Sequence, residues 1–124
     1  MIVIDTDILI EFLRGNGDIK KIFDDLIYQN QKNLYLTPIQ IAEIYAGIRD
    51  NERPFTERFL NSFQLIEIDK DIGKQAGEFL NKYRKSHAVE LADTLIGACA
   101  KKYGFKLWTL NKKHYPMFIG DELI

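Results

Sequence analysis

The amino-acid sequence predicts an α/β fold, a three-layer α/β/α sandwich around a mostly parallel central sheet of four to five strands. Short runs of β-favouring apolar residues alternate along the chain with longer stretches in which apolar residues recur at helical spacing. This alternation is typical of parallel strands joined by helical crossovers. The first run, Ile2-Val3-Ile4, is apolar throughout, as expected of a strand buried on both faces, and it leads directly into Asp5. Ligands of open parallel sheets lie beyond the carboxyl ends of the strands, so Asp5 is the first candidate for a functional group.

Two helices and a strand are predicted immediately after Asp5. Asp7 or Thr6 can cap a short amphipathic helix that ends at Gly15. A second amphipathic helix is expected over residues 18–29, followed by a short strand over residues 34–36.

The next helix has a clear start at Thr37. Threonine can cap a helix, Pro38 suits the first turn, and Gln40 stands where a capping box needs it. Apolar residues then recur at helical spacing, which leaves Glu43 on a neighbouring face of the helix.

The second half of the chain continues the same alternation. Helices are expected over residues 54–63, 71–85 and 89–103, the last stopped by Gly104. Strands are expected over residues 65–68 and 106–110, and residues 122–124 can add a short edge strand. Asp93 falls near the first turn of the last helix, where the helix dipole favours its charge even without a ligand.

Composition limits the classes of protein that this chain can belong to. Its 124 residues, 46% of them hydrophobic, predict a single domain over residues 1–124 with a sizeable core. Lys+Arg 17 against Asp+Glu 18 gives a net charge of −1, so an anionic partner must be held by a local cluster of charge. The single cysteine, Cys99, excludes an internal disulfide framework. No apolar run approaches the ~18 residues of a membrane span, and we expect a cytoplasmic protein.

Two acids share an unusual neighbour, a glycine one helical turn later. Gly47 follows Glu43 by four residues, and Gly97 follows Asp93 by four residues. Glycine inside a helix costs roughly 1 kcal/mol relative to alanine. The spacing indicates either close approach of a backbone or ligand beside each acid, or tight helix packing with the acids in solvent.

A second unusual feature is a cationic segment near the end of the chain. Residues 94–120 contain no Asp or Glu, yet they include five lysines. Lys112 and Lys113 follow the last long strand at the same rim as Asp5, where they can contact phosphates. Lys101 and Lys102 fit an ordinary solvated face equally well.

Four segments in register resemble the PIN-domain ribonucleases, specifically the short VapC-like toxins of toxin–antitoxin pairs, over essentially the whole chain. Residues 2–6 resemble the opening strand and first acid of that family, and residues 37–47 resemble its acid-bearing helix. Leu91-Ala92-Asp93-Thr94-Leu95-Ile96-Gly97-Ala98 is similar to its most recognisable helix. Residues 107–111, followed by His114 and Tyr115, resemble its closing strand and loop.

The resemblance implies a metal-dependent endoribonuclease with a PIN-like fold. Asp5, Glu43 and Asp93 would hold a divalent metal, and hard oxygen ligands select Mg²⁺ or Mn²⁺. Metal-assisted hydrolysis of RNA phosphodiester bonds would leave a 5′-phosphate. The implied partners are RNA, a small cognate antitoxin protein and a second copy of the chain in a homodimer.

Several positions depart from the family pattern. Asn111 stands where many relatives have a fourth acid, and we add it to the catalytic group because its carbonyl can ligate a metal or hold a bound water. Asp7 can supply the missing charge, although capping of the first helix is favoured. Thr6 and Thr109 are candidates for binding substrate, together with the lysine pair at 112 and 113.

Three other polar residues receive surface roles. Glu90 lies one turn before Asp93, where surface capping is favoured over the site. His87 and His114 have no identifiable carboxylate partner in the sequence, so both are expected at the surface.

Two non-catalytic alternatives remain at this point. A degenerate PIN scaffold is possible because Asn111 removes an acid. A receiver-like binding module would also have an acidic pocket at a strand end, but Asp69 and the lysines after the last strand are not arranged as that mechanism needs.

Overall fold

The computed structural model of the protein describes residues 1–30 and 33–124. Four strands form one sheet: β1 (Ile2–Ile4), β2 (Leu34–Leu36), β3 (Gln64–Leu65) and β4 (Lys106–Trp108). Their order is β3-β2-β1-β4, and every neighbouring pair is parallel. Ile2 pairs with Leu34 on one side and with Lys106 on the other, so β1 is a central strand as predicted.

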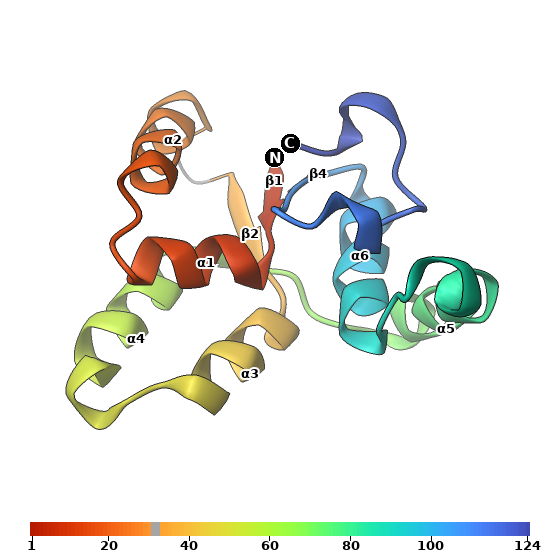
Figure 1. Cartoon of the computed structure of the whole chain (residues 1–124), viewed down its shortest axis with the longest axis horizontal. Helices are drawn as coiled ribbons and strands as arrows, with labels where there is room; N and C mark the ends of the chain where they lie inside the picture. Colours follow the sequence, from red (N-terminus) through yellow and green to blue (C-terminus); the bar gives the residue numbers. More distant parts are fainter. Residues whose placement is uncertain (31–32) are drawn as a thin grey trace.

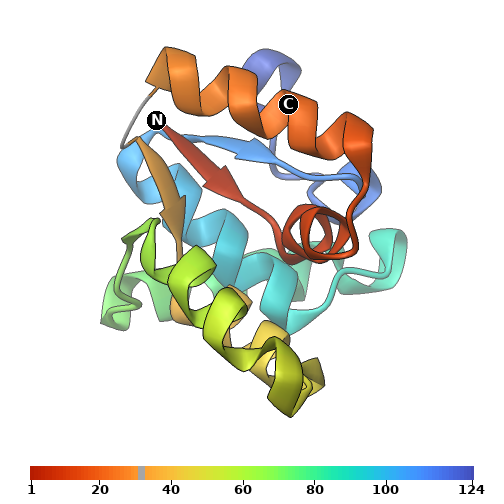
Figure 2. The ribbon, with the colours of Figure 1, turned by 90° about the vertical axis from the view of Figure 1, so that its left-hand side faces the viewer.

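Helices cover both faces of this sheet. They are α1 (Thr6–Leu13), α2 (Gly17–Asn30), α3 (Pro38–Gly47), α4 (Arg53–Asn61), α5 (Lys70–His87) and α6 (Leu91–Tyr103). Figure 1 shows α1 to α4 on one side of the strands and α5 with α6 on the other. Figure 2 looks from the α1–α4 side and shows β1 between β2 and β4, with α1 beginning just beyond the tip of β1.

Alternate side chains of β1 enter two separate cores. Val3 packs in a cluster with residues of α5, α6 and the C-terminal segment. Ile2 and Ile4 pack in a second cluster with residues of α1, α2, α3 and α4. Because neighbouring residues of a strand point to opposite faces, this division confirms the three-layer α/β/α sandwich.

The start of α3 joins that helix to the end of β1. Thr37 forms the predicted capping box with Gln40. Gln40 is fully buried, and its Nε2 donates to the backbone oxygen of Ile4 at 3.0 Å. Glu43 lies one helical turn beyond Gln40. The hydrogen bond from Gln40 to Ile4 therefore fixes the position of Glu43 relative to Asp5, the residue that follows Ile4.

The predicted strand over residues 65–68 is wrong in its bounds, because β3 covers only Gln64 and Leu65. Ile66 still donates its N–H to Leu36 at 2.8 Å, but the chain then turns into Asp69, whose carboxylate caps α5. Ile66 is buried although it lies outside the strand, so the alternation of apolar residues here reflects burial and not continued strand pairing.

The predicted strand over residues 106–110 is also too long, since β4 ends at Trp108. Thr109 and the N–H of Leu110 bind carboxylates instead of a neighbouring strand. At the end of the chain, a single bridge joins Leu123 to Leu107 in the place of the expected edge strand. No helix in residues 1–30 or 33–124 is long and apolar enough to span a membrane.

Candidate active site

The site lies where the chain order of the sheet reverses. The first two crossovers step outward from β1 to β2 and β3, and the third returns to place β4 on the other side of β1. Such a reversal separates the connecting segments and leaves a crevice at the carboxyl ends of the two strands. Asp5 follows β1 at this point and donates its N–H to the oxygen of Trp108 at 2.9 Å.

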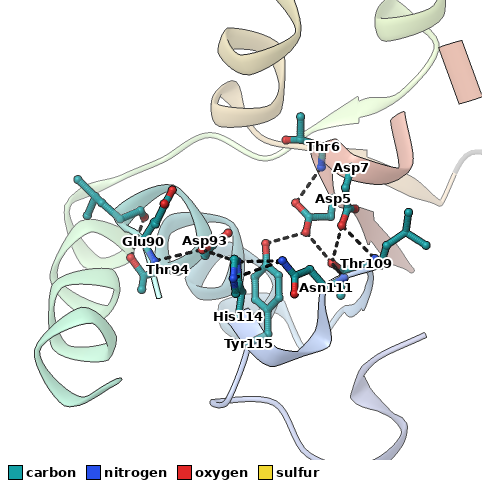
Figure 3. Close-up of polar contacts among 12 residues, drawn as sticks. Asp5, Thr6, Asp7, Glu90, Asp93, Thr94, Thr109, Asn111, His114 and Tyr115 are labelled. Carbon is teal, nitrogen blue, oxygen red and sulfur yellow. Dashed lines mark hydrogen bonds and ion pairs between the residues drawn. The ribbon is translucent and has the colours of Figure 1, made fainter. Parts of the chain in front are cut away.

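Three donors fix the carboxylate of Asp5, which is only 7% exposed. Its Oδ1 accepts from the N–H of Thr6 at 2.8 Å, and Asp5 is the N-cap residue of α1. Its Oδ2 accepts from Thr109 Oγ1 at 2.7 Å and from the Tyr115 hydroxyl at 3.0 Å (Figure 3). Burial nevertheless raises the pKa of Asp5, because these donors and the nearby His114 only partly offset desolvation of its charge.

Asp7 belongs to this cluster, and the prediction that it caps the first helix is wrong. It lies in the first turn of α1, one residue beyond the start, and its Oδ2 accepts from Leu110 N at 3.1 Å and from Thr109 Oγ1 at 3.3 Å. Its Oδ1 is buried and has no hydrogen-bond partner among the described residues. Burial, with a further contribution from the charge of Asp5, raises the pKa of Asp7 to about 6.

Asp93 reaches the same region from the start of α6. Its Oδ2 accepts from the N–H of Glu90 at 3.1 Å, so the helix-start role expected of it is present. Burial raises the pKa of Asp93, and the charge of Asp5 adds to this effect. The two acids predicted from opposite ends of the chain therefore interact electrostatically.

His114 is not the free surface residue predicted from sequence. Its Nδ1 lies 3.3 Å from Asp93 Oδ2, and its side chain is 33% exposed. Asn111 Nδ2 lies 3.2 Å from the same ring nitrogen, and Asn111 donates its N–H to Thr109 Oγ1 at 3.0 Å. Figure 3 shows Asp5, Asp7 and Thr109 on one side and Asp93 with His114 on the other, with Tyr115 and Asn111 between them.

Glu43 contacts this cluster through Thr6. It is an exposed residue of α3, and its Oε1 accepts from Thr6 Oγ1 at 2.9 Å. Thr6 therefore contacts Asp5 with its backbone and Glu43 with its hydroxyl. The hydroxyls of Thr6 and Thr109, which we expected to bind substrate, both donate to carboxylates.

The two glycines that follow the acids differ from each other. A Cβ on Gly47 would have nothing within 4 Å, so the expected close approach is absent there. A Cβ on Gly97 would lie 3.3 Å from Phe118 Cε2, 3.5 Å from Met117 Sδ and 3.6 Å from Tyr115 Cδ1. Gly97 therefore makes room for side chains of the C-terminal segment, while Asp93, with its side chain 19% exposed, is not left in solvent.

The lysines divide into paired and unpaired groups. Lys101 forms an ion pair with Glu122 at 2.8 Å, and Lys102 forms one with Asp69, so both stabilise the fold. Lys112 and Lys113 are exposed in a 3₁₀ turn that directly follows Asn111. This second pair lies between Asn111 and His114, and its contact with phosphates stays a prediction.

The chemistry of the cluster suits a hard divalent cation. Asp5, Asp7 and Asp93 all have raised pKa values, and an oxygen of Asp7 is buried without a donor, so negative charge is concentrated and incompletely compensated. All candidate donors are oxygens, which Mg²⁺ and Mn²⁺ prefer. Within residues 1–30 and 33–124, no three His, Cys, Asp or Glu side chains stand close enough to enclose an ion as now arranged. A bound cation would therefore require a side chain, most simply the exposed Glu43, to turn inward.

The α/β/α fold with an acidic cluster beyond the ends of β1 and β4 is that of a nuclease-like domain, and the family model of the PIN domain matches residues 2–116. The chain belongs to the PIN domain family. It is 36% identical over 121 residues to "Ribonuclease VapC10" of Mycobacterium tuberculosis, with 95% of this chain and 88% of that protein covered. It is 31% identical over 119 residues to "Ribonuclease VapC19" of the same organism, with 95% and 94% covered.

A solved structure has the same fold. The "Toxin-antitoxin complex from Klebsiella pneumoniae" contains a chain that superposes with a TM-score of 0.80 at 22% identity, covering 100% of this chain and 96% of that chain. This similarity confirms the PIN-like architecture predicted from the sequence.

Proposed function

We propose that this chain is a metal-dependent endoribonuclease that hydrolyses RNA phosphodiester bonds, and that it is the toxin of a toxin–antitoxin pair. The single observation that carries the proposal is the convergence of buried Asp5 with Asp93 at the switch point of the sheet, where the charge of Asp5 adds to the effect of burial in raising the pKa of Asp93. Membership of the PIN family and the relatives named as VapC ribonucleases support it. We also propose that residues 1–124 form one PIN-like domain, because both helical layers pack on the same sheet.

Asp5, Asp93 and Glu43 are the proposed ligands of Mg²⁺ or Mn²⁺. The cation, when bound, neutralises these carboxylates, stabilises charge on the phosphate and activates water for hydrolysis. Thr6 and Thr109 act through the acids, because their hydroxyls orient Glu43 and Asp5. Asn111, whose side chain contacts His114, is proposed to complete the catalytic group.

The proposed partners follow from the toxin assignment. The antitoxin would cover the acidic crevice, and a groove of about 410 Å³ between α1, α3 and α4 leads from Glu43 across apolar side chains, with Arg14 and Arg49 at its edges. Homodimer formation and a cytoplasmic location are proposed on the same basis. A non-catalytic scaffold or receiver-like module is not favoured, because the relatives that match nearly the whole chain at 36% and 31% identity are named as ribonucleases.

The proposal is tested by cleavage of RNA with the purified protein. We expect endonucleolytic products with 5′-phosphates in Mn²⁺ or Mg²⁺, and none in excess chelator. In cells, brief induction followed by sequencing of 5′ ends should give cuts that are missing with Asp93→Asn. If the wild-type and Asp93→Asn profiles are the same, cellular RNA is not the substrate.

Lys112 and Lys113 are expected to bind phosphates of the RNA. Replacing both with alanine should raise KM about tenfold with kcat little changed, because two phosphate contacts are lost outside the reacting centre. The matched control is Lys20→Ala with Lys21→Ala, an adjacent exposed pair on α2. The salt dependence of KM should become weaker only in the 112/113 variant. Equal effects of the two double variants would contradict a specific contact.

A further inference from the structure

Tyr115 is a buried residue of the site that the sequence did not identify. It is 1% exposed, and its hydroxyl donates to Asp5 Oδ2 at 3.0 Å. It comes from the segment after β4, beyond the turn that contains Lys112 and Lys113. A phenol is protonated at neutral pH, so this hydroxyl is a donor to the carboxylate.

The position of the ring is set by contacts on two sides. Tyr115 packs edge-on against Phe118, with ring centroids 6.0 Å apart. On the other side lies α6, where the missing side chain of Gly97 leaves room for Tyr115, Met117 and Phe118. The same helix presents Asp93 one turn earlier, so α6 supplies one acid directly and seats the tyrosine that holds the other.

We propose that Tyr115 is a positioning residue for the reaction, seated against Gly97 so that its hydroxyl fixes the orientation of Asp5. The inference rests on the proposed ribonuclease function. Asp5 Oδ2 has two side-chain donors, Thr109 directly after β4 and Tyr115 further along the same segment. With both in place the carboxylate presents one orientation to a cation. Without Tyr115, Oδ2 keeps only Thr109, and the carboxylate is held less firmly by Thr109 and by the Thr6 N–H at Oδ1.

The hydroxyl is separable from the packing of the ring. Tyr115→Phe removes one oxygen and leaves the apolar ring to fill its place beside Phe118 and Gly97. A hydrogen bond to a charged group is strong enough that its loss should lower Mn²⁺ affinity and kcat by about tenfold each. KM for RNA should stay within about twofold, because the hydroxyl is buried and its hydrogen bond is made to Asp5.

Gly97→Ala provides a second variant that leaves the hydroxyl in the chain. Its new methyl group would lie 3.3 Å from Phe118, which must give way slightly, and in ordinary contact with the Tyr115 ring at 3.6 Å. A shift of Phe118 disturbs the Tyr115 ring that packs edge-on against it. We expect the same loss of Mn²⁺ affinity with KM retained. Tyr115→Phe removes the hydroxyl, whereas Gly97→Ala disturbs the packing of the ring. Similar losses of Mn²⁺ affinity in both variants would identify the orientation of Asp5 as the common cause.

The experiment compares wild type, Tyr115→Phe and the control Tyr103→Phe, which alters a tyrosine that is 49% exposed at the end of α6. Mn²⁺ binding is measured by titration calorimetry, RNA cleavage gives kcat and KM, and Tm is measured for each variant. Lower Mn²⁺ affinity and kcat only in Tyr115→Phe, at unchanged KM and Tm, would support the inference.

Wild-type values in Tyr115→Phe, or losses explained entirely by its unfolded fraction, would overturn the inference while leaving the ribonuclease function intact. If wild type neither binds Mn²⁺ nor cleaves RNA, the proposed function fails and the inference fails with it.

Discussion

Replacing Asp5 with asparagine (Asp5→Asn) is expected to lower kcat by at least about a thousandfold, while the metal-free protein becomes more stable at about pH 7. Asparagine has nearly the same shape, and its oxygen can still accept from Thr109 and Tyr115. Asparagine lacks the negative charge that binds a divalent cation. The lost interaction between carboxylate and cation is worth several kcal/mol in the transition state. The substitution also removes a buried charge whose desolvation raises the pKa of Asp5.

The test of this prediction is that Asp5→Asn lowers kcat and raises the stability of the metal-free protein. RNA cleavage gives kcat, and unfolding in denaturant with excess chelator gives the free energy of unfolding. Asp24→Asn is the control, because Asp24 is an exposed acid of α2 remote from the crevice. Cleavage within about tenfold of wild type would remove Asp5 from the catalytic group. Loss of both activity and stability would mean that Asp5 serves mainly to hold the fold.

The free energy of unfolding of the metal-free protein is expected to fall as the pH rises from about 4 to about 7. The pKa of Asp7 is raised to about 6 from 3.8, so the folded state binds the proton more tightly than the unfolded state does. The resulting stability is fully present below the unfolded pKa and is lost as the pH rises through the folded one. Because Asp7 is only partly buried, solvent screening reduces its share to about 1 kcal/mol. Asp5 and Asp93 shift in the same direction and add to the slope.

A divalent cation should reverse this loss. Mn²⁺ at about one hundred times its dissociation constant stabilises the folded state by about 2.7 kcal/mol, and the gain should be largest where the acids are ionised. Denaturant unfolding across this pH range, with chelator and with Mn²⁺, measures both effects. Asp7→Asn is the matched variant, and it should flatten the metal-free profile without removing the slope due to the other two acids. A metal-free stability that rises toward neutral pH would refute the linkage.

The main features of the fold were predictable because local patterns were unambiguous. Ile2-Val3-Ile4 is apolar on both faces, and β1 pairs with a neighbouring strand on each side. The capping box at Thr37 also formed as expected. The segment after Leu65 was misjudged because alternating apolar residues fit either a strand or an extended connection. At the sheet edge, the cap that Asp69 forms on α5 ended the pairing.

The site was predictable only in part. Its acids could be named from strand ends, helix starts and the family resemblance. The roles of Asp7, His114 and Tyr115 could not, because each depends on contact with residues far away in the sequence, such as Thr109 or Asp93. A tyrosine in an apolar segment gives no sign in the sequence that its hydroxyl will meet a carboxylate 110 residues earlier.

That separation along the chain has a consequence during translation. Asp5 emerges from the ribosome before its partners Thr109 and Tyr115, which follow 104 and 110 residues later. Until then β1 lacks β4 as a neighbour, and the carboxylate lacks both of its side-chain donors. The growing polypeptide therefore contains the acids without the assembled crevice.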